Sequence, residues 1–312
     1  MLRSTRTLAT LSLALLLGAC TSPGSSTQPS APSQASLIPS AVPTEAAAAT
    51  PNACAANNLA TLSPGKLTVG SDNPAYPPYF EPDDAAPSGS PWELGDPTNG
   101  KGLEAATAYA VAANLGFTTG NVAWVAVPFN NAIQPGPKTF DLYLQEVSYS
   151  AERAQAVDLS DGYFDLNQAV VGLQEDAISK VTDVAGLKAF KLGAPVGTTS
   201  YQYITDTIQP TVDPAVYDTL DAAVAALQAK QIDGVVVDLP TAFYMRDAQL
   251  TGGVIVGSLP TVGQVEHFSI VLNKGSALTA CVNQAIAAIK ADGTLAGIVQ
   301  QWITSQGAPE LK

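Results

Sequence analysis

Short apolar runs and apolar stripes of helical spacing alternate along most of the chain. Runs of aliphatic and β-branched residues predict strands at 66–71, 122–127, 140–147, 169–174, 190–195 and 234–238. Apolar residues three or four positions apart predict helices at 101–115 and 220–227, and two more between Ser276 and Trp302. Strands that alternate with helices over this length are typical of α/β proteins with largely parallel sheets.

Four polar residues lie where predicted strands end. Asp72 follows the first strand, Glu146 and Ser148 end the strand at 140–147, and Asp238 ends the strand at 234–238. Ligands of open α/β sheets bind beyond the carboxyl ends of the strands. Any one of these residues alone is more often a helix cap or a solvated loop residue. Together they predict a binding site.

The first 19 residues are typical of a signal peptide. Two arginines precede a short apolar run, and small residues come directly before Cys20. The segment Leu-Gly-Ala-Cys at 17–20 is similar to a bacterial lipobox, which predicts cleavage before Cys20 and a lipid on its thiol. The alternative is an ordinary signal peptide that ends near a cysteine.

A tether of Ser, Pro, Ala and Thr is predicted at 20–53. Such a composition cannot bury enough apolar surface to offset its conformational entropy, so we expect it to be disordered. It would hold a folded domain on the order of 30 Å from its anchor. No other segment has about 20 uninterrupted apolar residues. We therefore expect the protein on the extracytoplasmic face of a bacterial cytoplasmic membrane, held there by the lipid alone.

Net charge argues against nucleic acid as a partner. The full chain carries a net charge of −13, and without residues 1–19 it has 12 Lys and Arg against 27 Asp and Glu, a net charge of −15. An acidic surface repels phosphates. The roughly 260 residues that follow the tether suit two domains better than one.

The three cysteines suggest a disulfide. If Cys20 carries a lipid, Cys54 and Cys281 remain as an even pair outside the cytoplasm, where disulfides persist. A bridge would join the two ends of the folded part. The alternative is two separate buried thiols.

Motifs for catalysis are absent from the sequence. His267 is the only histidine, there is no G-x-S-x-G elbow, and no group of His, Cys and acids has the spacing of a zinc site. We therefore expect no enzyme activity, no cofactor and no metal. A Gly-Thr-Thr-Ser turn at 197–200 precedes a helix, and its free N–H groups are suited to hold a carboxylate.

Five segments, in order, resemble those of one protein family. The family is the polar-amino-acid class of extracytoplasmic solute-binding proteins (bacterial solute-binding protein family 3), which are the receptors of ABC importers. The similarity runs from about Lys66 to Trp302, and its segments are KLTVGSDNPAYPPYF, GKGLEAATAYAVAANLGF, SYSAERAQAVDLSDGYF, GAPVGTTSYQYI and QIDGVVVDLPTAFY.

The resemblance implies a type II periplasmic-binding fold, in which two α/β lobes are joined by two extended crossovers. The crossovers would lie near 163–167 and 261–266. Lobe one would then comprise 54–164 and 266–312, and lobe two 165–265. Both Cys54 and Cys281 would fall in lobe one.

The resemblance also implies a ligand site between the lobes. Arg153 matches the arginine that clamps the α-carboxylate of an amino acid, with Ser148 and the Thr198-Thr199 turn as further carboxylate contacts. Asp238 matches the acid that receives the α-ammonium. Tyr76 and Phe129 match aromatics on either side of the ligand, and Asp72 matches a residue that selects its side chain. The alternative for Arg153 is a surface salt bridge, for instance with Glu152 or Asp158.

Three features depart from the family pattern. Glu146 stands where a small residue is usual, and Glu104 stands where an aspartate is usual. Glu146 and Asp72 would favour a cationic ligand side chain, unless a change of strand phase turns Glu146 away from the pocket. The stretch at 81–100, with Trp92, either covers the cleft or forms a surface loop.

The function implied is that of a monomeric receptor lipoprotein, which binds a polar amino acid and delivers it to an ABC permease with its ATPase. Two alternatives remain open. One is an enzyme on the same fold, such as a prephenate or arogenate dehydratase, with Glu146 as the proton-transfer group. The other is a sensory lipoprotein that reports on the amino acid to a membrane kinase.

Overall fold

The computed structural model describes residues 53–83, 90–303 and 307–312. The signal peptide, Cys20 and nearly all of the tether lie outside these residues. Within the part described, no helix is long and apolar enough to span a membrane.

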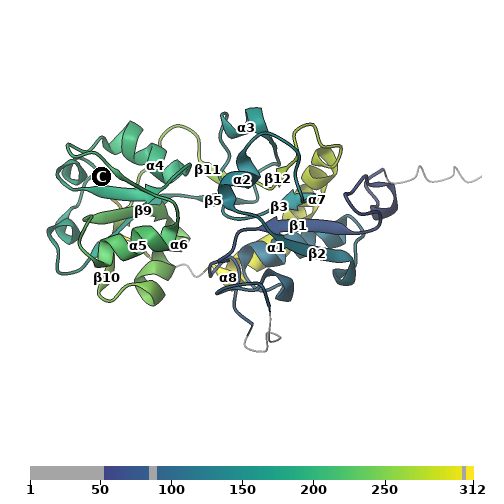
Figure 1. The fold of residues 1–312 in the computed structure, drawn as a ribbon, viewed down its shortest axis with the longest axis horizontal. Coiled ribbons are helices and arrows are strands. Elements are labelled where there is room, and N and C mark those ends of the chain that lie inside the picture. The colour runs from purple at the N-terminus through teal and green to yellow at the C-terminus, as the bar shows by residue number, and fades with distance from the viewer. Residues whose placement is uncertain (1–52, 84–89, 304–306) are drawn as a thin grey trace, which may run out of the picture. The chain divides into compact units, whose positions relative to one another are not determined.

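Two five-stranded sheets form the framework (Figure 1). The first sheet has the order β2-β1-β3-β12-β4, with β1 parallel to β2 and β3 and with β12 antiparallel to both of its neighbours. Its strands are β1 (Leu67–Ser71), β2 (Val122–Ala126), β3 (Leu142–Tyr143), β4 (Asp158–Leu159) and β12 (Val271–Leu272).

The second sheet has the order β10-β6-β9-β7-β8. Strand β7 is parallel to β8 and β9, whereas β6 is antiparallel to β9 and β10. The strands are β6 (Gln168–Leu173), β7 (Leu192–Pro195), β8 (Ala215–Tyr217), β9 (Gly234–Asp238) and β10 (Gly253–Ser258). Between the two sheets in sequence, β5 (Phe164–Leu166) and β11 (Glu266–Phe268) pair with each other as a two-stranded antiparallel ladder.

Helices pack on both sheets. Helix α1 contacts α7 and α8 on the first sheet, and α5 and α6 cover the second. The helices are α1 (Leu103–Asn114), α2 (Phe129–Ile133), α3 (Arg153–Ala156), α4 (Thr199–Tyr203), α5 (Leu220–Gln228), α6 (Leu239–Tyr244), α7 (Thr279–Ala291) and α8 (Thr294–Trp302). Single π-helical turns, at Ile204–Ile208 and Met245–Gln249, extend α4 and α6.

Alternation along the strands explains why both faces of the second sheet are covered. In β6, Ala169 and Val171 pack with α5 and α6, while Val170 faces a separate core that includes Ile204 and Leu311. Successive side chains of a strand point to opposite faces, so a continuous apolar run needs a cover on each face.

The C-terminal residues differ from their predicted place. Residues 307–312 were expected in lobe one, but Leu311 is buried in the core of the second sheet, and Glu310 forms a bridge with Ser258. The apolar side chain of Leu311 is buried in the same hydrophobic cluster as Val256 and Leu259. The remaining lobe limits stay a prediction.

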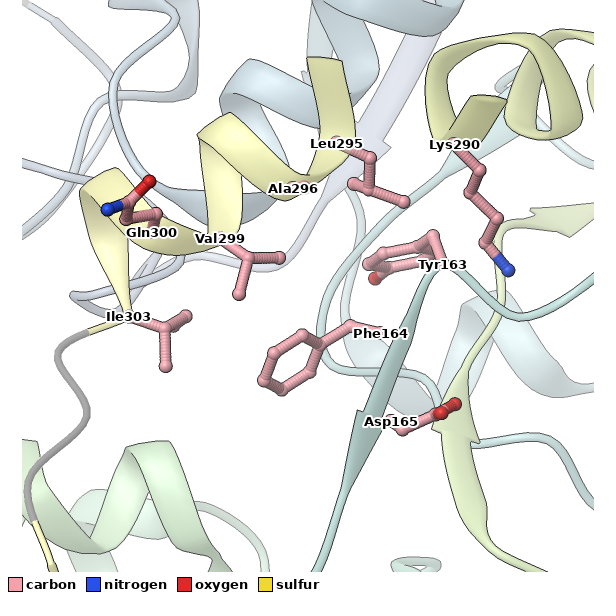
Figure 2. A pocket seen from close by; sticks show the side chains of 9 residues that line it. All are labelled: Tyr163, Phe164, Asp165, Lys290, Leu295, Ala296, Val299, Gln300 and Ile303. Atoms are coloured by element: carbon pink, nitrogen blue, oxygen red, sulfur yellow. The ribbon is translucent and has the colours of Figure 1, made fainter. Parts of the chain in front are cut away.

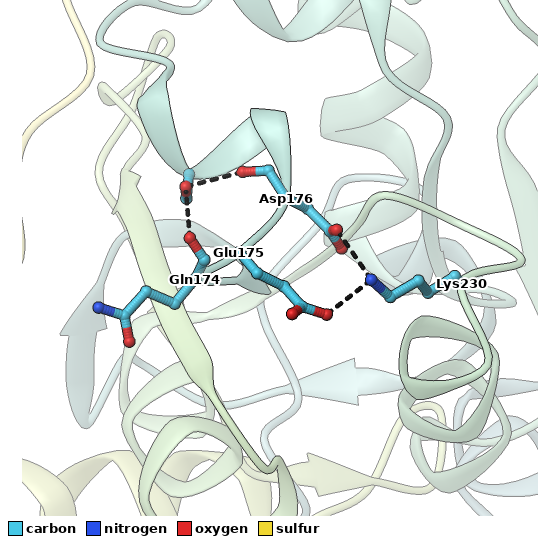
Figure 3. A network of polar contacts seen from close by, with 5 residues as sticks. Gln174, Glu175, Asp176 and Lys230 are labelled. Carbon is cyan, nitrogen blue, oxygen red and sulfur yellow. Dashed lines mark hydrogen bonds and ion pairs between the residues drawn. The ribbon is translucent and has the colours of Figure 1, made fainter.

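Cys54 and Cys281 form a disulfide, with their Cα atoms 5.3 Å apart. The bridge fastens the start of the described chain to α7. Trp92, in the stretch predicted either to cover the cleft or to form a surface loop, packs against the core of the first sheet. On the surface of the second sheet, Lys230 contacts Glu175 at 2.6 Å and Asp176 at 3.1 Å (Figure 3).

Candidate functional site

Arg153 is buried at the start of α3, and its side chain contacts both the segment after β3 of the first sheet and the turn after β7 of the second. Its Nη1 donates to the carbonyl of Ser148 at 2.5 Å, and its Nη2 donates to the carbonyl of Gly197, in the turn after β7, at 2.8 Å. The guanidinium lies 5.3 Å from the centroid of the Phe129 ring. These contacts use two of its five N–H donors and fix the plane of the group.

Asp238 ends β9 on the second sheet and belongs to a buried polar cluster. The Gln168 amide Nε2 donates to Asp238 at 2.5 Å and to Glu266 at 2.9 Å, while Ser200 donates to the Gln168 carbonyl at 2.6 Å. Burial raises the pKa of Asp238 well above its usual range, and the charges of Glu266 and Glu146 raise it further.

The side chain of Glu146, which follows β3 of the first sheet, contacts α6 on the second sheet. Its Oε2 accepts a hydrogen bond of 2.8 Å from Thr241 on α6, and the Thr241 hydroxyl lies 3.0 Å from that of Tyr79. Burial and the nearby Glu104 raise the pKa of Glu146 to about 8. Glu146 has a φ of +54° and lies beyond the end of β3, so strand alternation does not determine the direction of its side chain.

Glu104 lies behind Glu146 in the first turn of α1 and is fully buried. Its Oε1 accepts the N–H of Glu146 at 2.7 Å and a very short hydrogen bond from the Tyr163 hydroxyl. Its Oε2 has no hydrogen-bond partner among the described residues. Burial raises the pKa of Glu104 to about 7.

A glycine makes this arrangement of α1 possible. A Cβ on Gly102 would lie 2.3 Å from the carbonyl oxygen of Tyr79, and its φ of +103° is one that other residues rarely adopt. The Tyr79 carbonyl therefore reaches the start of α1, where it accepts the N–H of Glu104 at 3.0 Å. Gly102 thus brings Tyr79 and Glu104 to the same site.

Asp72 lies at the end of β1 and is held by backbone groups. Its carboxylate accepts the N–H of Phe129 at 2.9 Å and that of Asn73 at 2.7 Å. Burial raises its pKa, although these two bonds oppose the shift. Tyr76 is buried nearby, and burial together with the charge of Asp221 raises its pKa.

The turn at 197–199 supplies polar groups from the second sheet. Thr198 caps α4, because its hydroxyl accepts the N–H of Tyr201 at 3.2 Å and donates to the Pro195 carbonyl at 2.8 Å. The turn thus has a fixed geometry beside Arg153, to which Gly197 is bonded directly.

A cavity of about 390 Å³ brings most of the predicted site residues together. Eight of the nine line it: Asp72, Tyr76, Phe129, Glu146, Arg153, Thr198, Thr199 and Asp238. Ser148 is not among the lining residues, and it enters the site through its carbonyl, which holds Arg153. Among the described residues that line the cavity, Arg153 is the one basic group, against four acids: Asp72, Glu146, Asp218 and Asp238.

Sequence reasoning missed several residues that shape this site. Gln168 opposes Asp238 directly in the ladder of β6 and β9, so its position could have been found from strand pairing. Thr241 lies three residues after Asp238, in the first turn of the following helix. Glu104 was noted as a departure from the family pattern but not as part of the site.

A second, larger hollow of about 830 Å³ lies between α8 and β5 (Figure 2). Its lining is mainly apolar, with Phe164, Leu295 and Val299, and its charged groups are Asp165 and Lys290. Lys290 donates to the Gly162 carbonyl at 2.5 Å. Because polar groups do not converge here as they do around Arg153, the smaller cavity is the better candidate for a small polar ligand.

The chain is similar to known proteins over most of its described length. Residues 67–305 match the family of bacterial extracellular solute-binding proteins, family 3. The chain belongs to this family. It is 30% identical to the ABC transporter arginine-binding protein 1 of Escherichia coli (strain K12) over 170 residues, which cover 53% of this chain and 67% of that protein.

Solved structures show the same fold. An ancestral arginine-binding protein bound to arginine aligns with a TM-score of 0.61 and 26% identity, over 77% of this chain and 99% of that one. An ancestral amino acid-binding protein described as a precursor of cyclohexadienyl dehydratase aligns with a TM-score of 0.60 and 25% identity, over 77% and 96%. The fold is the two-lobed type II periplasmic-binding fold, as the sequence predicted.

Proposed function

We propose that the protein is a receptor that closes on a polar amino acid and hands it to an ABC permease. Arg153 binds the α-carboxylate together with the turn at Thr198 and Thr199. Asp238 receives the α-ammonium. Tyr76 and Phe129 flank the ligand, and Asp72 and Glu146 face its side chain.

One observation carries this proposal. A single buried guanidinium, already fixed in plane by two carbonyls, shares a cavity with several carboxylates. A zwitterion presents one anionic and one cationic group on the same carbon, so it complements both. Charge-assisted hydrogen bonds of this kind are roughly twice as strong as neutral ones, and a planar fork binds a carboxylate with two parallel bonds.

Hydrogen bonds across the cavity support a coupling between ligand binding and a change of shape. Arg153 is bonded to Gly197 and Glu146 to Thr241, so residues on both sides of the cavity are already linked. We propose that the lobes open about β5 and β11 and that the ligand stabilises the closed form.

Thermal unfolding of the purified protein with each common amino acid tests the proposal. A ligand at 100 times its Kd adds about 2.7 kcal/mol to the free energy of unfolding. We expect a rise in Tm with one or a few polar amino acids. No rise with any of them would overturn the proposed function.

Lipid attachment at Cys20 belongs to the same proposal, since a tethered receptor stays near its permease. Replacement of Cys20 by alanine is expected to release the protein from the membrane fraction without a change in the amino acids it binds. Retention of Cys20→Ala in that fraction would contradict the anchor. Loss of uptake on deletion of a permease, with binding intact, would distinguish transport from sensing.

A second candidate is a dehydratase, which the state of Glu146 favours. A carboxyl group with a pKa near neutrality in a cavity with an arginine is suited to donate a proton to a leaving hydroxide. Turnover of prephenate or arogenate that is lost in Glu146→Gln would establish this activity. Amino-acid binding with no turnover would exclude it.

A further inference from the structure

Recognition of a plain zwitterion does not use two adjacent carboxyl groups: that of Glu146, which is half-buried and lines the cavity, and that of Glu104, which is fully buried behind it. Glu146 and Glu104 are linked through the N–H of Glu146, and Glu104 is fully buried with one oxygen that lacks a partner among the described residues. Neither group forms a salt bridge with any residue that the structure describes.

Among the described residues, no basic side chain forms an ion pair with Glu104 or Glu146, and Arg153, which lines the same cavity, interacts instead with the charges of Asp238, Glu266 and Glu152. The titratable side chains that interact with the pair from the adjoining elements are Asp72 directly after β1, Tyr76 and Tyr79 from the loop before α1, Tyr143 from β3, Tyr163 before β5, and Asp238 from β9. All of these are neutral or negative. Burial disfavours the charged form of both carboxyl groups, and two carboxylates so close together also repel each other, so the pair retains a proton.

We propose that the Glu104–Glu146 pair is a cation subsite, so that an amino acid with a cationic side chain binds with release of a proton and a neutral one does not use it. Glu146 contacts the ligand cation because it lines the cavity, and Glu104 is a positioning residue because it lies behind. This inference rests on the proposed function and deepens it.

The proton balance is simple. A guanidinium or ammonium group arrives with its positive charge, and its approach stabilises the ionised form of Glu146. The proton that the pair held passes to the solvent, and the complex gains the ion pair in its place. No bond other than that O–H bond is broken.

Tyr163 and Thr241 hold the pair in position from two sides. Tyr163, directly before β5, donates to Glu104, and Thr241 on α6 donates to Glu146. The pair is therefore in contact with both the crossover and the second sheet. A cation that binds Glu146 is therefore bound beside the hydrogen bond that links Glu146 to Thr241 across the cavity.

Calorimetry in buffers of different ionisation enthalpy tests the proposal with L-arginine and L-glutamine as probes. The slope of observed enthalpy against buffer enthalpy gives the protons released per ligand. At pH 6.5 we expect arginine to release about one proton more than glutamine, because the pair is protonated before binding. From pH 6 to pH 8, the affinity for arginine should rise by up to about tenfold per pH unit, and the affinity for glutamine should not show this added rise.

Two variants separate the roles of the pair. Glu146→Gln should remove the difference in proton release and weaken arginine more than glutamine. Glu104→Gln removes the second-largest cause that raises the pKa of Glu146, after burial, so it should lower that pKa, reduce the extra proton release and strengthen arginine binding at pH 6.5. A merely structural role for Glu104 predicts no such gain. Glu175→Gln, an exposed exchange of the same kind on the second sheet, is the control and should match the parent protein.

The outcomes are distinct. Equal proton release with arginine and glutamine, or an unchanged difference in Glu146→Gln, overturns the cation subsite and leaves amino-acid binding standing. If neither these two probes nor any other amino acid binds, the proposed function fails, and the subsite fails with it.

Discussion

The two ends of the cavity differ in how their charges are satisfied. At the Arg153 end, a positive group is fixed by two carbonyls and an aromatic ring. At the Glu146 end, two acids share buried space, held by an N–H group and by hydroxyls, with no salt bridge among the described residues. In the function we propose, the first end binds the α-carboxylate of any amino acid, whereas the second pairs only with a cationic side chain. In this proposal, one end of the cavity recognises the backbone groups shared by all amino acids, and the other end selects among amino acids by their side chains.

The largest expected effect is at the Arg153 end. Arg153→Ala removes the partner of the ligand carboxylate, which should cost about 2–5 kcal/mol, or roughly 30- to 5,000-fold in Kd, for every amino acid that binds. Arg246→Ala removes an arginine that lies beside Asp247 on the surface and serves as the control. Titration calorimetry measures both. A loss of affinity confined to cationic ligands would show that Arg153 does not bind the α-carboxylate shared by all amino acids.

The disulfide should affect neither end. Replacement of Cys54 and Cys281 by serine frees a loop of 227 residues in the unfolded chain and should lower the free energy of unfolding by about 2–5 kcal/mol. Denaturant unfolding measures this change. We expect the Kd values for all ligands to stay as they are in the parent protein, since the bridge lies at α7 and does not line the cavity.

The Glu146 end should make stability depend on pH. The pKa values of Glu104 and Glu146 are raised in the folded state to about 7 and about 8, above the usual value of 4.5. The folded protein therefore holds more protons than the unfolded chain between pH 4.5 and 8, and its stability without ligand should fall as the pH rises through that range. In the double variant Glu104→Gln/Glu146→Gln, this part of the fall in Tm should disappear. If Tm falls equally steeply with pH in the parent protein and the double variant, the pH dependence of stability comes from other groups.

The smallest expected effect is on the surface. Lys230 is exposed and contacts Glu175 and Asp176 in water (Figure 3), where ion pairs contribute little. Lys230→Ala should leave Tm and every Kd unchanged within the error of measurement. A clear shift in ligand preference would mean that charge at a distance, rather than contact, determines the choice.

The sequence predicted the Arg153 end better than the Glu146 end for a physical reason. Strand and helix periodicity located β1, β9 and α1 closely, and the side chains at strand ends gather in one cavity as sheet topology requires. The strand predicted at 140–147 is paired only at Leu142–Tyr143, because the chain turns to a left-handed conformation at Glu146. Alternation therefore could not orient that side chain. Nor could local patterns show that Glu104, on an apolar helix, touches a residue 42 positions away.

The place of the last six residues had no local signal either. Leu311 lies among exposed neighbours in sequence, and only the core of the second sheet explains its burial. A contact of this kind depends on packing between segments far apart in the chain.

One comparison tests the central claim most directly, that Arg153 binds the α-carboxylate of an amino acid. The best-binding amino acid and its α-carboxamide are titrated into the parent protein and into Arg153→Ala. In the parent protein, the carboxamide should bind at least about tenfold more weakly, because it lacks the charge that the guanidinium pairs with. In Arg153→Ala the two should bind alike. Equal affinity for both in the parent protein, or the same ratio in the variant, would contradict the account.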